Sequence, residues 1–597
     1  MERRTFLKST GATVLGGTLG AGSVIGALDP SNSLARGTTP QPPTSLRGGI
    51  KGRGKPLETE SADLSPYTGP WGDAQLRHLL RRCMFGVPES QFTSAQALGS
   101  MDAVVTQLLA CQDLTKVPLP APFATWLNTI PISSPNLLAV ENIEIANWWF
   151  DQMMQETLSL RQKMTLLWTN NFVTGSQTVN IAQYVYTYLM TCMKYALGNF
   201  KDFAGAISID PAMLVYLNGD QSYVTSKTNN VNENFARELM ELFTLGIAFP
   251  GTDIPNYTQD DIENSARALT GWSPTTTAPF IGQFNSARHD TGQKTFLGQT
   301  GNWALTDIIN IIFQQPTASP AYPPGAPSGF PQGYTAAYWA CQKMYKEFVY
   351  YNPSVTDPNG TVRDAMARLM LNPPSPYNPF DIAPVMQALL TSAHFYDAAV
   401  IGAQIKSPVQ YLGSLVREFW LTYPAFDSSA PPDSGKKDGN NNEIYNDTNP
   451  TLTVMTSGIL SNLGQQLLNP PNVAGWPGGE NWLSAGSFQT REANSYIALS
   501  GGYVNSKKNW DLAFSADGYA LQIQNSTSIS DTALSQALEN LSLAFQTTPT
   551  SVLGPIESTI LDTEIQGTYK DPNYQYNTLG VQNFAEVLTD LPEFQLF

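Results

Sequence analysis

The stretch VNENFARELMELFTLG, residues 231–246, decides the fold class because its apolar residues recur at the spacing of a helix. Asn230 and Glu233 stand three residues apart at its start, the arrangement of a capping box that satisfies free N-terminal amides. Gly246 follows the last apolar residue, as a helix-ending glycine commonly does. The face that we expect to be buried carries Phe235, Leu239, Leu242 and Phe243. The stretch therefore predicts an amphipathic helix from Val231 to Leu245.

The same helical period occurs along most of the chain. Beyond the first helix, Thr258 and Asp261 form a second capping box, and Gly271 closes the helix that they open. Further helices are predicted over Gln75–Phe85, Glu141–Thr157, Leu158–Trp168, Ile181–Leu197 and Phe203–Leu217. No repeat recurs at a fixed period. We therefore expect a mainly α protein with a large multi-helix body.

Three segments depart from the helical period. Residues 280–284 and 294–297 alternate apolar and polar side chains on either side of Asp290-Thr291-Gly292, which predicts a small β-hairpin. Two stretches rich in proline and glycine, 316–334 and 423–450, have loop composition. We expect both to be surface insertions, because helical patterns of the same character resume after each.

The first residues have the layout of a targeting signal. Arg3 and Arg4 precede Phe-Leu-Lys, the pattern of a twin-arginine export signal, and an uncharged, Gly-rich run follows from Gly11 to Ala27. A membrane anchor would need about 20 strongly apolar residues, and this run is shorter and diluted by Gly, Ser and Thr. The predicted division is a removable signal peptide over 1–35, a flexible linker over 36–65 and the folded domain over 66–597.

Export by this route would deliver a folded protein to the periplasm, the cell surface or the medium. No later segment is long and apolar enough to cross a membrane, so we expect no membrane span in the mature chain. The net charge of −16 argues against nucleic acid and anionic membranes as partners, since an acidic chain repels phosphate groups.

Four cysteines stand at positions 83, 111, 192 and 341. No two of them form a Cys-x-x-Cys pair, which excludes a zinc ribbon or a thioredoxin-like motif. Export would permit disulfides, but each cysteine lies in an apolar helical context. We favour buried free thiols.

The first candidate site is the polar side of the helix that opens at residue 231. Asn234, Glu238 and Glu241 fall on one side of it, and Arg237 is four residues from both Glu233 and Glu241. One interpretation is an ion-pair lattice that bridges this helix to another, such as the one with Arg267. The alternative is a pair of carboxylates that performs acid–base chemistry in a cleft, with the arginine tuning them. The apolar surroundings favour the structural interpretation.

The second candidate is Arg288-His289-Asp290, beside the predicted hairpin turn. A loop histidine next to an aspartate suits a general base or a proton relay, and a hydrogen bond that stabilises the hairpin explains it equally. Only two other histidines exist, His78 and His394, in separate segments. We therefore predict no transition-metal site and no cofactor. An Asn/Asp cluster at 440–447 supplies oxygen ligands for calcium but lacks the EF-hand spacing.

The third candidate is the loop PPNVAGWPGG, residues 470–479. Its glycines permit backbone conformations closed to other residues, and they flank Trp476. The indole either stands exposed, ready to stack on a sugar or a partner, or packs inward at a rigid corner. The sequence leaves both alternatives open.

Several ordered blocks resemble the family catalogued as "domain of unknown function 1800". They are LLRRCMFG at 79–86, NENFAREL at 232–239, ALTGW at 268–272, His289-Asp290, KTFLG at 294–298, KSPV at 406–409, PPNVAGWPGG at 470–479 and PEFQ at 592–595. The resemblance implies export, often by the twin-arginine route, and a neighbouring gene for a second exported protein. Members often carry Trp-His-Asn-His-Phe where this chain has Trp168-Thr169-Asn170-Asn171-Phe172, so a role of those two histidines would be lost here.

Two functions remain open at this point. In the first, which we favour, the chain is a binding or assembly factor that acts with a co-exported partner or a surface polymer. In the second, it is a metal-independent hydrolase or lyase that cuts polysaccharide with its carboxylates and the loop histidine. An aromatic-lined groove with Glu238 or Asp290 at its floor would favour the enzyme, and a flat apolar patch would favour the partner.

Overall fold

The helix Asp73–Cys83 (α2) shows how the apolar spacing builds the body. Its core face repeats every three or four residues, as the pattern of a buried helical stripe requires. The apolar residues of that face are all buried: Leu76, Leu79, Leu80 and Cys83. The helix predicted over Gln75–Phe85 is thereby confirmed, with its start two residues earlier.

The computed structural model describes residues 64–110, 135–318, 321–419 and 450–500, the stretches 421–423, 503–505 and 510–514, and residues 426, 589 and 595. All of them belong to one unit of the chain, Leu57–Phe597. The signal peptide with Arg3 and Arg4, nearly all of the linker, Cys111 and most of the insertion at 423–450 lie outside the described residues.

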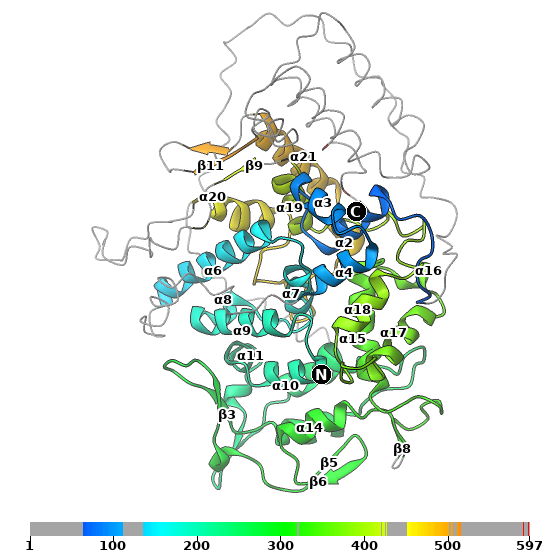
Figure 1. Ribbon diagram of the computed structural model, residues 1–597. Coiled ribbons are helices and arrows are strands. Elements are labelled where there is room, and N and C mark those ends of the chain that lie inside the picture. The colour runs from blue at the N-terminus through cyan, green and yellow to red at the C-terminus, as the bar shows by residue number, and fades with distance from the viewer. Residues whose placement is uncertain are drawn as a thin grey trace, which may run out of the picture. The chain divides into compact units, whose positions relative to one another are not determined.

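The described chain is mainly helical (Figure 1). After α2, its α-helices are α3 (Glu89–Gln96), α4 (Met101–Leu109), α6 (Pro135–Gln155), α7 (Arg161–Thr169), α8 (Ser176–Val179), α9 (Ala182–Tyr195), α10 (Phe200–Ser208), α11 (Pro211–Tyr216), α12 (Asn234–Glu238), α13 (Gln259–Ala268), α14 (Leu305–Ile312), α15 (Tyr334–Phe348), α16 (Pro353–Thr356), α17 (Thr361–Leu371), α18 (Ala383–Leu390), α19 (Pro408–Glu418), α20 (Pro450–Thr453) and α21 (Ala485–Ser500). Two π-helices, η3 (Leu239–Thr244) and η5 (Val454–Leu460), continue α12 and α20, and the 3₁₀ turns are η2 (Gly219–Gln221), η4 (Ser286–Arg288) and η6 (Gly479–Trp482).

The strands form small antiparallel sheets. The pairs are β1 (Tyr223–Val224) with β2 (Asn229–Asn230), β3 (Trp272–Pro274) with β4 (Gly282–Phe284), β5 (Lys294–Phe296) with β6 (Gln299–Gly301), and β7 (Thr317–Ala318) with β8 (Ala321–Tyr322). A three-stranded sheet has β11 (Trp510–Phe514) between β10 (Tyr503–Asn505) and β9 (Leu421–Thr422).

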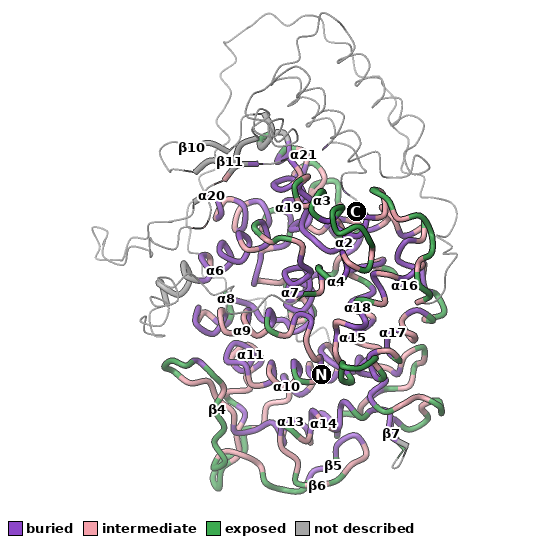
Figure 2. The backbone as a smooth tube through the Cα atoms, viewed as in Figure 1, coloured by how far each residue is buried: buried purple, intermediate pink, exposed green. Residues whose placement is uncertain are grey.

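Helix α9 lies at the centre of the part that carries the site. It packs against α6 on one side and α10 on the other, with α7 and α11 also in contact (Figure 1). Its core side chains, including Tyr184, Tyr188 and Leu189, are buried. Figure 2 shows buried residues throughout α7 and α9, whereas the β4 hairpin is largely exposed. The apolar core therefore lies between helices, and the hairpins lie at its edge.

The stretch Phe203–Leu217, predicted as one helix, is two. It divides into α10 and α11 because Pro211 has no N–H to continue the helical hydrogen bonds. Asp210 caps the second helix, its Oδ1 accepting the N–H of Ala212 at 3.0 Å. A proline at the first position of a helix behind an aspartate is a start signal, which the apolar period concealed.

The predicted hairpin pairing of 280–284 with 294–297 is wrong. Both segments form strands, β4 and β5, but each pairs with a nearer neighbour: β4 with β3, and β5 with β6. The residues Asp290-Thr291-Gly292 therefore connect two hairpins rather than turning one. The capping box at Thr258 and Asp261 is confirmed at the start of α13.

The insertion at 316–334 is more structured than its composition predicts. It contains the hairpin β7–β8, and its Tyr322 is buried and donates a hydrogen bond to Asp261 of α13. Cys83, Cys192 and Cys341 are buried free thiols, as predicted. Within the described residues, no helix is long and apolar enough to cross a membrane.

Candidate functional site

The helix that opens the sequence analysis changes type halfway. α12 begins at Asn234 and the π-helix η3 takes over at Leu239. The capping box predicted from Asn230 and Glu233 is absent: Asn230 lies in β2, and Asn232 accepts the N–H of Asn234 at 2.9 Å instead. π-helical turns within a helix are rare and occur often at functional sites.

The wider π-turn leaves carbonyls that side chains from elsewhere bind. Trp339 of α15 donates its indole N–H to the Leu242 carbonyl at 3.0 Å. Asn171 donates to the Phe243 carbonyl at 3.5 Å. Asn256 donates to the carbonyls of Leu245 and Gly246, both at 3.0 Å. Helix carbonyls without an internal partner need such donors, so tertiary contacts hold η3 in its shape.

The neighbouring Asn170 holds the glycine-rich loop. Its Oδ1 accepts the N–H of Trp476 at 2.7 Å, and its Nδ2 donates to the Trp476 carbonyl at 3.2 Å. Gly475 has φ +80°, and a Cβ added there would lie 2.2 Å from Asn170 Oδ1. The loop can approach Asn170 only because that residue is glycine. Trp476 itself is buried, which answers the alternative left open: the indole packs inward.

Two of the ordered sequence blocks therefore meet at two adjacent asparagines. Asn170 and Asn171 lie between the loop at 470–479 and the helix at 234–244. Sequence reasoning singled out the loop and the helix separately and missed both asparagines. The sequence feature that could have pointed to these asparagines is their position, within the segment where the family resemblance implies two histidines.

Glu238 is the unpaired group of this site. It is half-buried, and no hydrogen bond or ion pair joins its carboxyl to another described residue. Burial and, to a lesser degree, the charge of Glu241 raise its pKa to about 7, against the lowering effect of Arg237. A carboxyl that is protonated near neutrality can donate a proton.

Glu241 differs from Glu238 in its contacts. Its Oε2 accepts the hydroxyl hydrogen bond of Tyr257 at 3.1 Å. Burial and the Glu241 charge raise the pKa of Tyr257, so this phenol stays protonated and donates. Tyr216 of α11 lies on the Glu238 side, where burial and the Glu238 charge raise its pKa. Two carboxyls in unequal surroundings form the arrangement that separates an acid from a base.

Arg237 and Asn234 lie at the exposed edge of the helix. The Arg237 guanidinium donates to Glu233 at 3.1 Å and to Gln259 of α13 at 3.2 Å. The expected i,i+4 ion pair thus forms, and the bridge reaches the expected helix α13 through Gln259 rather than Arg267. Asn234 is exposed. Both groups are 38–39% exposed in the ion pair, so it contributes little to stability.

Arg288, His289 and Asp290 hold a turn together. Asp290 accepts two hydrogen bonds from Arg267, at 2.8 and 3.2 Å, and one from the Gly292 N–H at 2.8 Å. Burial raises the pKa of Asp290, but these donors and Lys294 lower it below its usual value. His289 Nδ1 lies 3.0 Å from the Thr270 carbonyl. Arg288 lies 4.3 Å above the Tyr223 ring.

The two titratable clusters are not one site. Gln259, which contacts Arg237, begins α13, and Arg267, which contacts Asp290, lies near its end. Eight residues of helix separate the two contacts by about 12 Å. The geometry therefore does not bring His289 to the Glu238 carboxyl.

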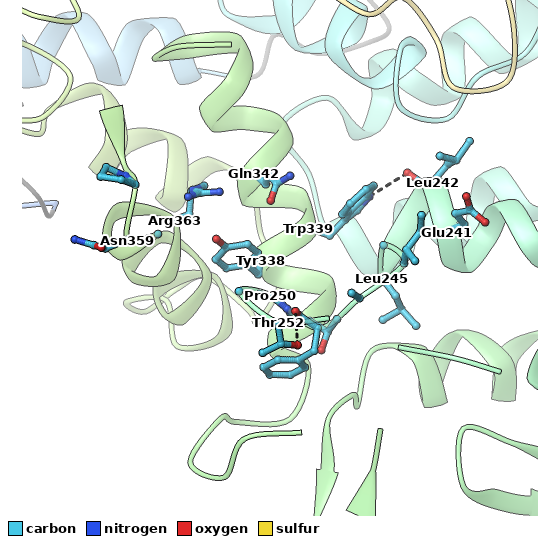
Figure 3. Close-up of a pocket in the computed structure, with 18 residues that line it drawn as sticks. Glu241, Leu242, Leu245, Pro250, Thr252, Tyr338, Trp339, Gln342, Asn359 and Arg363 are labelled. Carbon is cyan, nitrogen blue, oxygen red and sulfur yellow. Dashed lines mark hydrogen bonds between the residues drawn. The ribbon is translucent and has the colours of Figure 1, made fainter. Parts of the chain in front are cut away.

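A pocket of about 440 Å³ lies beside η3 (Figure 3). Its aromatic wall consists of Tyr338 and Trp339, and Gln342 and Arg363 also line the cavity. The Trp339 indole is fixed by its bond to Leu242, and Arg363 is held by Asp357 at 2.9 Å. Glu241 lines this pocket, but Figure 3 shows its carboxylate pointing away from Tyr338 and Arg363.

An enzyme site was expected to be an aromatic-lined groove with Glu238 or Asp290 at its floor, and the structure has only part of this arrangement. The pocket is aromatic, yet neither Glu238 nor Asp290 lines it. The carboxyl pair faces Tyr216 and Tyr257 instead. Across the described residues, no three His, Cys, Asp or Glu side chains gather as a metal site would require. This arrangement can bind a polar ligand and can exchange a proton through Glu238.

The comparisons with known proteins give a family and no function. No curated protein and no solved structure matches the chain. The sequence model of one family, described as "Protein of unknown function (DUF1800)", matches residues 78–322 and 332–596. Those ranges include the helix at 234–244, the Asn170–Asn171 segment and the loop at 470–479, and with nearly the whole chain matched, the protein belongs to the DUF1800 family.

Proposed function

We propose that this protein is an exported, metal-independent hydrolase or lyase that acts on a polysaccharide, with Glu238 as its acid. The observation that carries the proposal is the state of the Glu238 carboxyl: half-buried, unpaired among the described residues, and with a pKa of about 7. A general acid works best when its pKa lies near the operating pH. A carboxylate with only a structural role would be expected to have an ion-pair or hydrogen-bond partner, and Glu238 has none among the described residues.

Cleavage of a glycosidic bond requires two carboxyl groups in different protonation states. To hydrolyse a glycosidic bond, an acid gives its proton to the leaving oxygen while a carboxylate takes a proton from the water that attacks the sugar carbon. Glu238 supplies the proton, and Glu241, one turn further along the helix, supplies the carboxylate. Tyr257 donates a hydrogen bond to Glu241 and so fixes its orientation. His289 is not needed in this scheme.

The substrate class rests on one prediction from the sequence and one observation of the structure. The export signal predicted from Arg3 and Arg4 would deliver the protein to a compartment where polysaccharides are the abundant polymers. The pocket beside η3 offers aromatic and amide side chains, the groups that bind sugars.

The test measures release of reducing ends, or of unsaturated sugars, from polysaccharides prepared from the native cell envelope. Glu238→Gln should lower the rate at least about 100-fold, as loss of a general acid does. The matched control is Glu263→Gln, an exposed carboxylate of α13 that bonds only Gln259 among the described residues. Equal rates for the parent and Glu238→Gln would remove Glu238 from the mechanism.

A second function, binding without turnover, is favoured by the rigid Trp339 in the pocket. In this case the chain is a binding or assembly factor that acts with a co-exported partner on a surface polymer. Trp339→Ala and Gln342→Ala should then abolish retention on the immobilised polymer. Phe284→Ala, which removes an aromatic ring that is 45% exposed on β4, is the control. Retention that depends on Trp339, with no product released by the parent, would favour this second function.

A further inference from the structure

We infer that a second pocket, between α6, α8 and η5, binds a neutral sugar unit of the substrate. It has a volume of about 380 Å³. Asn142 comes from α6, Ser176 and Gln177 from α8, Asn180 from the end of α8, Thr456 from η5, and Gln466 from the segment that follows. The pocket is separate in its lining from the Trp339 pocket.

The lining selects a ligand without charge. None of its side chains is ionisable, although the chain as a whole has a net charge of −16. Carboxamides offer an acceptor and two donors each, and hydroxyls offer both. A sugar presents several hydroxyl groups that need both kinds of partner. An anionic or cationic ligand would meet no countercharge here.

One acceptor of the pocket, Asn142 Oδ1, has no hydrogen-bond donor among the described residues. The Asn142 side chain is only 8% exposed, and its Nδ2 donates to the Ser176 carbonyl at 3.3 Å. A buried polar atom without a partner calls for an explanation, and a ligand hydroxyl that donates to Asn142 Oδ1 supplies one.

The backbone around the pocket is irregular on several sides. Leu468 has φ +59°, in the left-handed region that a branched side chain rarely adopts, and Asn180 at the end of α8 has φ +48°, which asparagine tolerates. The Leu468 carbonyl accepts the N–H of Ser176 at 2.8 Å, which ties this strained residue to the pocket wall. Thr456 lies on a π-helix. Strained and π-helical backbone concentrates at binding and catalytic sites.

A chain of contacts joins this pocket to the Glu238 site. A Cβ added at Gly175 would lie 3.2 Å from the Tyr216 ring and 3.8 Å from Asn469 Oδ1. Asn469 donates to Gln466 of the pocket at 3.2 Å. Tyr216 in turn lies close enough to Glu238 for that charge to raise its pKa. The sugar unit bound here would thus neighbour the bond cut at Glu238, an assignment that rests on the proposed function.

The experiment measures binding in the Glu238→Gln background, so that a failure of catalysis does not mask a failure of binding. The probes are neutral glucose, mannose and xylose hexasaccharides, an oligogalacturonate and a glucosamine oligomer, titrated by calorimetry to about 10 mM, which covers affinities weaker than about 1 mM. At least one neutral hexasaccharide should bind, and the charged oligomers should bind at least about tenfold more weakly.

Gln177→Ala is the first variant because Gln177 is exposed and its side chain makes no hydrogen bond to another described residue, so the fold does not depend on it. Asn142→Leu is the second, since it keeps the branched arrangement of side-chain heavy atoms and removes the amide. Both should lower the affinity for the neutral hexasaccharide at least about tenfold. Glu263→Gln, an exposed carboxylate of α13 that lines neither pocket, should leave it unchanged. Binding that no pocket variant weakens, preference for a charged oligomer, or no neutral binding at all would overturn the inference.

Discussion

Asn170 and Asn171 are adjacent in the sequence but bind different elements. The first holds the loop at 470–479 through Trp476, and the second binds the carbonyl of Phe243 in η3. Pattern reading assigns asparagines to turns and surfaces, and it has no means to see a contact between residues about 300 positions apart. The carboxyls could be found from the sequence because helical spacing brings them together. The burial of Glu238 and the hydrogen bond between Tyr257 and Glu241 could not be found in this way.

Gly475→Ala tests the contact between Asn170 and the loop. Its φ of +80° strains any other residue, and the new Cβ would lie 2.2 Å from Asn170 Oδ1. Gly464→Ala is a matched control, with φ +89° and no neighbour within 4 Å of the added Cβ. The control should lose about 1 kcal/mol of unfolding free energy and Gly475→Ala about 2–3 kcal/mol or more. Equal losses of unfolding free energy for the two variants, measured by denaturant titration, would mean that Asn170 can move away from the added Cβ without loss of stability.

Glu238→Gln tests the environment of the carboxyl through stability. The folded pKa is about 7, above the usual 4.5, so between these values the folded state retains a proton that the unfolded state releases. Stability from this group is therefore lost as the pH rises from 4.5 to 7. An ion-pair scaffold, the interpretation favoured by the sequence, would instead make the substitution destabilising.

The expected result is a gain of about 1–2 kcal/mol in unfolding free energy for Glu238→Gln at pH 8, after discounting for partial exposure, and no gain at pH 4. The difference between variant and parent isolates this group from Glu156 and Asp210, which also titrate. Chemical denaturation at both pH values measures it. A loss of stability at pH 8 would restore the scaffold interpretation.

Among the elements, η3 is a case in which the local sequence pattern predicts a helix but not its type. The apolar spacing predicted one continuous helix from 231 to 245, and most of its core face is indeed buried. Asn171 and Trp339 donate to carbonyls of its π-helical turn, and Asn256 donates to the Leu245 carbonyl directly after it. Those residues belong to three other segments, so the helix itself carries no sign of them.

The strand pairing failed for a related reason. The alternation of apolar and polar residues locates β4 and β5 but does not show which strands they pair with. β5 turns into β6 through Leu297 and Gly298, with φ of +44° and +77°. Positive φ at both central residues is the type I′ hairpin turn, and Leu-Gly is not the usual Asn-Gly or Asp-Gly signal for it. A bulky leucine in that conformation could not be anticipated.

The segment 168–172 carries the prediction about metal. Thr169 and Asn171 are buried, at 5% and 3% exposure, at the positions where the family resemblance implies histidine. Neither an amide nor a hydroxyl binds zinc or iron as strongly as an imidazole. We expect protein purified without chelator to carry well under one equivalent of zinc, iron, manganese or copper per chain. Elemental analysis after dialysis measures this, and a retained stoichiometric metal would contradict it.

At the scale of the whole molecule, the sequence predicts the mainly α architecture correctly because the helical period recurs in segment after segment. It does not predict that Asn170 and Asn171 join the loop at 470–479 to η3, since no local pattern encodes which segments become neighbours. Nor does it predict either pocket. Trp476, which composition leaves ambiguous, is buried because Asn170 holds its backbone.

Export belongs to the whole molecule as well. Replacing both Arg3 and Arg4 by Lys should leave the precursor in the cytoplasm, because the twin-arginine translocase reads that pair specifically. Cell fractionation followed by immunoblotting measures the distribution, with a co-expressed protein that uses the general secretion route as the control. Normal export of the double variant would contradict the twin-arginine assignment.

The central claim is that Glu238 is a protonated acid near neutral pH. It is tested most directly by a pH titration of the side-chain carboxyl ¹³C signals in protein labelled at glutamate, with the Glu238 signal assigned by its absence from Glu238→Gln. The account predicts a midpoint of about 7, with activity on the polysaccharide falling as the pH rises through the same value. A midpoint near 4.5 would show an ordinary surface carboxylate and contradict the account.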